Sequence, residues 1–85
     1  MKPWYVYVIQ SDEGFIYTGM TQSLSKRMDD HNSGRTYTTR RGTSWIIIYT
    51  ETCQDSALAR KREKYFKNTA GKEWLQRRGY LKAPE

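Results

Sequence analysis

The run WYVYVIQSDEGFIYTG, residues 4–19, predicts a β-hairpin. From Trp4 to Ile9 the residues are β-branched or aromatic throughout, which indicates a strand that is covered on both faces. Because side chains alternate along a strand, Tyr5 and Tyr7 are expected to share one face. The segment SDEG, residues 11–14, is typical of a turn that ends in glycine. The following FIYTG therefore fits a returning antiparallel strand.

A short helix is predicted after this hairpin. The apolar positions Leu24 and Met28 follow helical spacing, and His31 continues it. Thr21 or Ser23 can cap the N-terminus of this helix, since a hydroxyl oxygen there accepts a hydrogen bond from a backbone N–H of the first turn.

The middle of the chain predicts the end of this helix, then a loop and then a third strand. The tripeptide NSG, residues 32–34, is a helix stop signal. Residues 35–44 combine Arg, Thr and Gly without apolar periodicity, which predicts a basic loop. The run WIIIY, residues 45–49, consists of large β-formers and predicts a third strand in a central position of the sheet.

A second helix is predicted from about residue 57 to residue 68, with Asp55 or Ser56 as its cap. Its apolar side chains recur at helical spacing, so they are expected to gather on one side. They are Leu58, Ala59, Tyr65 and Phe66.

The C-terminal part predicts one more short helix, around Trp74 and bracketed by Gly71 and Gly79. We expect a single domain over residues 1–80 and a frayed tail over residues 81–85. The fold class that follows is α/β (α+β): a small three-stranded antiparallel sheet in meander order, flanked by helices.

Charge and composition restrict the classes of partner. The 85 residues carry a formal net charge of +6, which favours polyanions and above all nucleic acid, although Lys and Arg that only solubilise the surface would give the same charge. One cysteine, Cys53, permits no internal disulfide, and with one histidine it is too little for a Cys/His zinc site. No apolar run approaches the length of a membrane span, so we expect a cytoplasmic protein without a membrane partner.

Four motifs stand in order along the chain: Tyr5-Val6-Tyr7, Tyr17-Thr18-Gly19, Leu24-Ser25-Lys26-Arg27 with His31-Asn32-Ser33-Gly34, and the stretch from Ala59 to Lys67. They resemble the motifs of the GIY-YIG nuclease family, and the similarity covers nearly the whole chain. It is closest to the small, solitary bacterial members, rather than to homing endonucleases or to the nuclease domains of excision-repair enzymes. Tyr5 stands where the glycine of the family's first motif would be, and Thr18 replaces the isoleucine of the second; both positions are expected to fill strand faces.

The resemblance implies that Tyr7 and Tyr17 lie beside the scissile phosphate, where one of them orients or deprotonates the attacking water. A phenol has a pKa near 10, so a general base needs a nearby cation or metal ion to favour the phenolate. Arg27 would neutralise charge that builds up on the phosphate. His31, one helical turn further, would assist the nucleophile or bind phosphate. The alternative interpretation makes the tyrosines ordinary cross-strand aromatics, Arg27 a solvated residue and His31 a capping one.

Glu63 matches the family's metal-binding carboxylate. The resemblance implies one weakly held Mg²⁺ or Mn²⁺ that keeps most of its waters and takes its remaining ligands from the substrate. The alternative is an ordinary helix pair between Glu63 and Lys67. Arg62 falls within the apolar face of the second helix, so it either extends along the surface to solvent or reaches a phosphate.

Basic and polar residues in the loop and on the second helix are the candidates for contacts to DNA phosphates. A solvated, mobile connection is the alternative for the loop. Asn68 is the only candidate, after Glu63, for an asparagine that larger nucleases of this family use. The candidates are Arg35, Tyr37, Arg40, Arg41, Arg60, Lys64, Lys67 and Asn68.

These features predict a metal-dependent endonuclease of low sequence specificity that acts on DNA, including branched or damaged forms, as a monomer or a weak homodimer. Two alternatives stay open. The first is a nucleic-acid-binding module that has lost turnover or depends on a partner protein for activity. The second is a structural or protein-interaction domain whose charge serves solubility. The pathway, whether DNA repair or defence against mobile elements, does not follow from the sequence.

Overall fold

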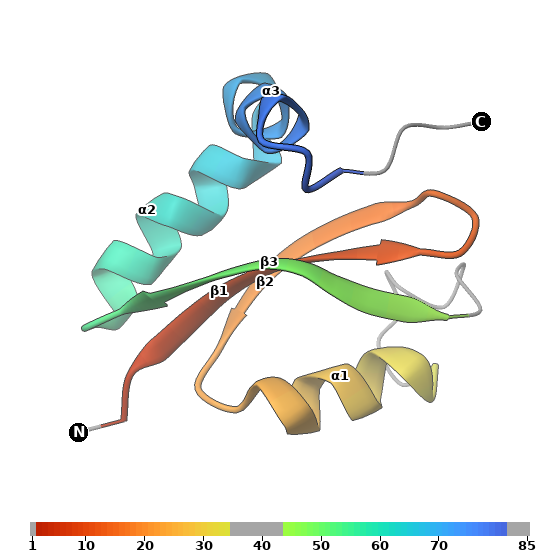
Figure 1. The fold of residues 1–85 in the computed structure, drawn as a ribbon. Helices are drawn as coiled ribbons and strands as arrows, with labels where there is room; N and C mark the ends of the chain where they lie inside the picture. Colours follow the sequence, from red (N-terminus) through yellow and green to blue (C-terminus); the bar gives the residue numbers. More distant parts are fainter. Residues whose placement is uncertain (1, 35–43, 82–85) are drawn as a thin grey trace.

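The computed structural model describes residues 2–34 and 44–81, which form a three-stranded sheet with helices on both sides (Figure 1). The predicted fold class is confirmed. In chain order the elements are β1 (Trp4–Ser11), β2 (Ile16–Thr21), α1 (Leu24–Asn32), β3 (Trp45–Cys53), α2 (Ser56–Lys67) and α3 (Thr69–Arg77).

The strand order is β2-β1-β3, and both neighbours run antiparallel to β1. The predicted meander order, and the central position predicted for the third strand, are therefore wrong. The central strand is the one whose consecutive side chains are all covered, and Val6 to Ile9 of β1 are fully buried. In β3, by contrast, Ile46 and Ile47 are 47% and 41% exposed. Large β-formers thus identified β3 as a strand but not its place in the sheet.

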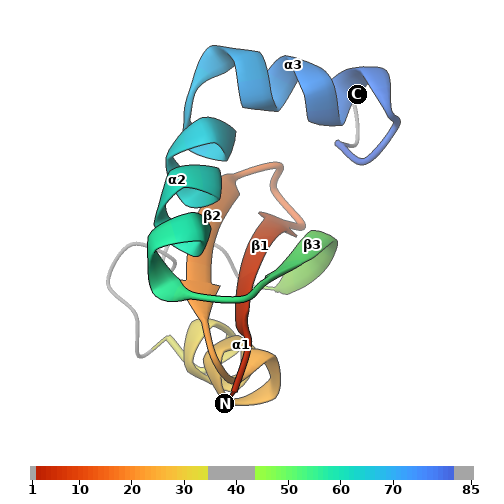
Figure 2. The same cartoon turned by 90° about the vertical axis from the view of Figure 1, so that its left-hand side faces the viewer.

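The two faces of the sheet carry separate cores, because successive side chains of β1 alternate between them. Val6 and Val8 pack with residues of α2 and α3, namely Ala59, Phe66 and Leu75. Tyr7 and Ile9 pack with Trp45 and with Leu24 and Met28 of α1. Figures 1 and 2 show the result, with α1 on one side of the sheet and α2 with α3 on the other.

The helices begin and end close to the predicted residues. Ser23 is the N-cap residue of α1 but makes no side-chain capping bond, whereas the Asp55 carboxylate accepts a hydrogen bond of 2.8 Å from the Leu58 N–H at the start of α2. Within the described residues, no helix combines the length and the apolar character that crossing a membrane requires.

Two predictions for the C-terminal helices need correction. Leu58 is 46% exposed and does not share the buried side of α2 with Ala59 and Phe66, because it lies about 100° around the helix from Ala59. Gly71 lies inside α3 rather than before it, and a methyl group added there would overlap the Tyr65 carbonyl. Gly71 thus lets α3 approach the end of α2 closely.

Candidate active site

Three rings from β1, β2 and α1 meet on the α1 side of the sheet. Tyr7 pairs with Gly19 in the β1–β2 ladder, and the missing side chain of Gly19 leaves room for the Tyr7 phenol. The ring centroids of Tyr7 and Tyr17 are 6.3 Å apart, and that of His31 lies 5.7 Å from Tyr7 and 5.0 Å from Tyr17. The Tyr7 hydroxyl is hydrogen-bonded to Nε2 of His31 at 2.8 Å.

Arg27 joins this cluster from α1, one turn before His31. Its guanidinium interacts with the phenols of Tyr7 and, more weakly, Tyr17, and these interactions raise the pKa of Arg27. Arg27 is half-buried, so part of the guanidinium stays accessible to an anion. The alternative of a solvated helix residue therefore does not describe Arg27.

Burial decides the protonation states of the cluster. It raises the pKa of Tyr7 to about 12, although the hydrogen bond from Arg27 acts in the opposite direction. Arg27 is the cation that a phenolate would need, but its effect on the pKa of Tyr7 is smaller than the effect of burial. Tyr7 is therefore a neutral phenol near pH 7. Burial, followed by the charge of Arg27, also lowers the pKa of the buried His31. A neutral imidazole can accept the Tyr7 proton at Nε2, with its own proton on Nδ1.

Glu63 of α2 acts on the same cluster through its charge. This helix packs against β1 and β2 on the opposite face of the sheet from α1. Even so, the Glu63 charge is close enough to the Tyr7 phenol to contribute to the rise in its pKa. Oε2 of Glu63 also lies 3.8 Å from Nζ of Lys67, so the helix pair named as an alternative is present as well.

A divalent ion fits Glu63 only in a limited way. Among residues 2–34 and 44–81, no three His, Cys, Asp or Glu side chains gather as a metal cluster. Glu63 is a half-buried single carboxylate, and Lys67 competes for it. This donor set suits a hydrated Mg²⁺ or Mn²⁺ that shares the substrate's phosphate oxygens, and it does not suit a dedicated protein cage.

The predicted DNA contacts divide between α2 and the part of the chain outside the described residues. Arg60, Lys64 and Lys67 are exposed on α2, and Asn68 is the exposed residue that links α2 to α3. The loop candidates lie outside the described residues; they are Arg35, Tyr37, Arg40 and Arg41.

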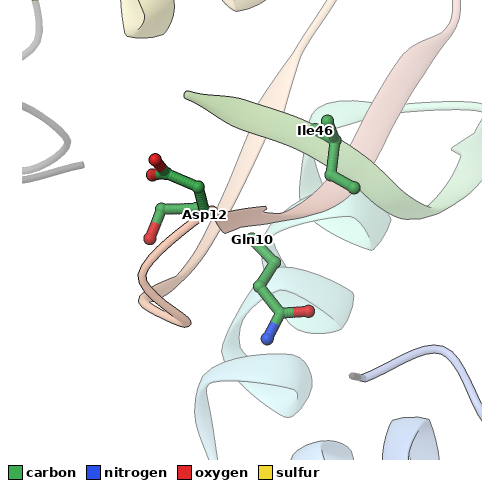
Figure 3. Close-up of a pocket in the computed structure, with 4 residues that line it drawn as sticks. Gln10, Asp12 and Ile46 are labelled. Atoms are coloured by element: carbon green, nitrogen blue, oxygen red, sulfur yellow. The ribbon is translucent and has the colours of Figure 1, made fainter. Parts of the chain in front are cut away.

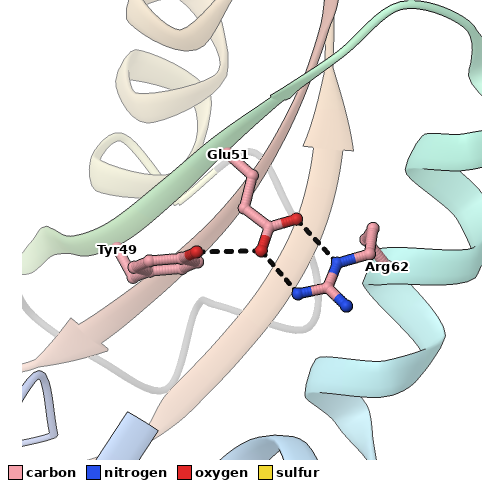
Figure 4. Close-up of polar contacts among 3 residues, drawn as sticks. All are labelled: Tyr49, Glu51 and Arg62. Carbon is pink, nitrogen blue, oxygen red and sulfur yellow. Dashed lines mark hydrogen bonds and ion pairs between the residues drawn. The ribbon is translucent and has the colours of Figure 1, made fainter. Parts of the chain in front are cut away.

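Arg62 is anchored to the sheet by a carboxylate that the sequence did not indicate. Its Nε donates to Oε2 of Glu51 at 2.8 Å and its Nη2 to Oε1 at 2.7 Å (Figure 4). The Tyr49 hydroxyl donates to the same carboxylate at 2.8 Å. The guanidinium also lies over the rings of Tyr65 and Phe66, 4.8 and 5.0 Å from their centroids. Arg62 thus extends along the aromatic surface of α2, and its guanidinium forms an ion pair that ties α2 to β3.

A separate pocket lies where β1 ends. It has a volume of about 280 Å³ and is lined by Gln10, Ser11, Asp12 and Ile46 (Figure 3). Gln10 and Ser11 are buried, whereas Ile46 belongs to the exposed side of β3. None of the predicted catalytic residues lines this pocket.

Comparison with known proteins gives one family and a group of relatives. The model of the GIY-YIG catalytic domain matches residues 3–78. UPF0213 protein DP2720 of Desulfotalea psychrophila is 36% identical over 85 residues, which cover 96% of this chain and 74% of the relative. UPF0213 protein ORF82 of Orgyia pseudotsugata multicapsid polyhedrosis virus is 37% identical over 79 residues, 78% of this chain and 73% of the relative. UPF0213 protein YhbQ of Escherichia coli (strain K12 / DH10B) is 30% identical over 64 residues, 74% and 64% of the two chains. The names of these relatives state no activity, and no solved structure matches the chain significantly.

Proposed function

The chain belongs to the GIY-YIG catalytic domain family, a family of nucleases, and from this premise we propose that it is a divalent-metal-dependent endonuclease that hydrolyses DNA phosphodiester bonds with low sequence specificity. The observation that carries the proposal is the meeting of Tyr7, Tyr17, Arg27 and His31 in one hydrogen-bonded cluster within electrostatic reach of Glu63. Residues from β1, β2 and α1 meet there, and Glu63 of α2 acts on Tyr7 through its charge.

The protonation states favour a proton relay rather than a free phenolate. The oxygen of Tyr7 accepts a proton from the attacking water while its own hydroxyl proton moves to Nε2 of His31. The hydrogen bond of 2.8 Å provides the path of this transfer, and the lowered pKa of His31 favours the later return of the proton. The relay avoids the cost of ionising a phenol whose pKa is raised to about 12.

Arg27 and Glu63 take the electrostatic roles. Arg27 stabilises the charge that develops on the phosphate oxygens through its fork of donors. Glu63 holds the divalent ion, as nucleases of this family generally use one. When bound there, the ion would polarise the phosphate and offset charge on the leaving oxygen. Three exposed cations on α2 bind neighbouring phosphates of the DNA; they are Arg60, Lys64 and Lys67.

A second candidate function is a DNA-binding module that lacks turnover alone and depends on a partner protein. The observation in its favour is the weak metal environment: one carboxylate, with the Lys67 ammonium 3.8 Å away. The two functions differ at Glu63, because an enzyme needs this carboxylate for cleavage, whereas a binder tolerates its loss.

The test is cleavage of supercoiled plasmid and of a set of branched oligonucleotides with Mg²⁺, Mn²⁺ or EDTA. Glu63→Gln and Arg27→Ala are compared with two controls on exposed helix positions, Glu73→Gln and Lys26→Ala. Metal-dependent nicking that both site variants lose and both controls keep supports the enzyme. If every protein binds DNA equally and none cuts it, the binding module replaces the enzyme.

A further inference from the structure

The C-terminal end of α3 holds an aromatic side chain in a fixed and exposed position. The Tyr80 N–H donates to the Leu75 carbonyl at 3.0 Å, and the Gly79 N–H donates to the Gln76 carbonyl at 3.1 Å. With Gly79 at φ 79°, these bonds form a Schellman motif, which fixes the backbone of Tyr80. The Tyr80 side chain is nevertheless 40% exposed.

Other rings support Tyr80 from within the domain. Its ring stacks on Trp74 with an interplanar angle of 17° and a centroid distance of 6.1 Å. Tyr49 lies 4.9 Å from Tyr80 and 5.4 Å from Trp74, so the stack rests on β3. An aromatic ring that is already ordered loses little conformational entropy when a second flat ring stacks on it.

One cation lies against this stack, and a second is exposed on the last turn of α3. The Arg78 guanidinium lies over the Trp74 ring, 4.9 Å from its centroid. Arg77 is exposed and lines an open groove of about 460 Å³ together with Glu73 and Gln76. Two guanidinium groups against one carboxylate leave this end of α3 positive, which favours an anionic ligand over a cationic one.

We propose that Trp74, Arg77, Arg78 and Tyr80, here called the α3 platform, bind an unpaired nucleotide of single-stranded nucleic acid. The base stacks on Tyr80, and the adjoining phosphates contact Arg77 and Arg78. In a duplex the faces of the bases are covered by their neighbours, so a stacking platform selects unpaired nucleotides, whereas phosphate contacts alone do not. Single-stranded DNA and RNA share this chemistry.

The α3 platform is distinct from the proposed catalytic cluster, and binding there requires no cleavage. For the proposed endonuclease, it adds a preference for substrates in which a single strand adjoins a duplex. A failure of the nuclease proposal leaves the platform intact, and a failure of the platform leaves cleavage of plain duplex intact.

The test is fluorescence anisotropy with labelled oligo-dT, oligo-U and a DNA duplex, in EDTA so that metal-dependent cleavage is suppressed. Tyr80→Phe keeps the ring, whereas Tyr80→Leu keeps an apolar side chain at this cap position but removes the ring. Since each stacked base adds to the affinity, we expect Tyr80→Leu to weaken oligo-dT binding about tenfold and Tyr80→Phe to stay within about twofold of wild type. Duplex binding is expected to change little in either variant.

The double variant Arg77→Ala with Arg78→Ala is expected to weaken the binding of all three ligands. The slope of log affinity against log salt concentration should fall by the amount expected for the loss of about two phosphate contacts. Thermal unfolding of each variant separates these effects from misfolding. If folded Tyr80→Leu binds both oligo-dT and oligo-U as tightly as wild type, or if it loses as much affinity for duplex as for the single strands, the platform is overturned. Equal losses for oligo-dT and oligo-U support a shared single-strand site, and a loss for one alone assigns the site to that nucleic acid.

Discussion

Gly19 faces Tyr7 across the β1–β2 ladder, and a methyl group added at Gly19 would lie 2.5 Å from the Tyr7 hydroxyl oxygen and 2.7 Å from its ring carbon Cζ. Gly19→Ala must therefore displace the phenol from His31 and Arg27. Overpacking of this kind costs about 1–3 kcal/mol. We expect a loss in urea-unfolding free energy of that size, together with loss of cleavage and of the Tyr7–His31 hydrogen bond as seen by NMR.

Gly14 provides the matched control for this substitution. It has a φ of 92° and open space around its Cα, so Gly14→Ala strains the backbone without touching Tyr7. A cost of about 1 kcal/mol is expected with cleavage retained. Equal cleavage by Gly19→Ala and Gly14→Ala would show that the Tyr7 position is not critical.

His31 predicts a dependence of stability on pH. Its pKa is lowered in the folded chain by burial, and further by Arg27, so the unfolded chain binds a proton more readily. The stability that the neutral imidazole contributes is complete above about pH 6.5, the usual pKa of histidine, and is lost as pH falls from there toward the lower folded pKa. Since His31 is the one histidine of the sequence, its Cε1 proton reports the folded pKa without ambiguity. His31→Gln should flatten the stability curve between about pH 5 and 7; a midpoint above about 6.5 in the NMR titration would contradict the prediction.

The ion pair between Arg62 and Glu51 predicts energetic coupling between α2 and β3. The pair is bidentate, but the Arg62 side chain is 41% exposed, so we expect a coupling free energy of about 1 kcal/mol rather than the larger value of a buried pair. A double-mutant cycle with Glu51→Gln and Arg62→Met, measured by urea unfolding, gives this number. Tyr49→Phe is the control, because it removes one donor to Glu51 and leaves the pair in place. A coupling free energy near zero would mean that the ion pair does not stabilise the fold.

The same pair predicts a second pH effect, at acidic pH. The hydrogen bonds from Arg62, together with the one from Tyr49, hold the pKa of Glu51 below its usual range. A carboxylate with a lowered pKa stabilises the fold above its unfolded pKa, near 4.3, and this stabilisation is lost as pH falls toward the folded value. Wild type should therefore lose more stability than Glu51→Gln between about pH 5 and 3. Parallel curves for the two proteins would argue against a strong pair.

The sequence predicted the helices and strands because each has a regular spacing of apolar residues and turn or cap residues at its ends. The β1–β2 hairpin follows from strand composition around SDEG, and α1 and α2 follow from apolar spacing and caps. The strand order could not be predicted this way, because local patterns carry no information on whether β3 pairs with β2 or with the other edge of β1. A run of isoleucines is compatible with either place.

The site residues that lie in the family's motifs could be predicted from the sequence, and those outside the motifs could not. Tyr7, Tyr17, Arg27 and His31 came from the resemblance, and β-pairing and helical spacing explain why they meet. Glu51 had no such signal, because a lone acid in a strand, eleven residues before Arg62, has no fixed geometry relative to a helix. The pairing of Tyr7 with Gly19 depends on the loop closing between Ser11 and Phe15, one residue later than the turn predicted over residues 11–14.

Lys67 predicts opposite changes in metal and DNA binding. Its ammonium lies 3.8 Å from the Glu63 carboxylate and opposes a divalent ion there, so Lys67→Ala should lower the Mg²⁺ concentration for half-maximal cleavage by about threefold, given that partly exposed charges interact by up to about 1 kcal/mol. The same change removes a phosphate-binding cation, so the DNA concentration for half-maximal cleavage should rise. Lys64→Ala, at an exposed position of the same helix, should raise only the DNA requirement. A higher Mg²⁺ requirement in Lys67→Ala would show that Lys67 supports the Glu63 site, or that the ion binds elsewhere.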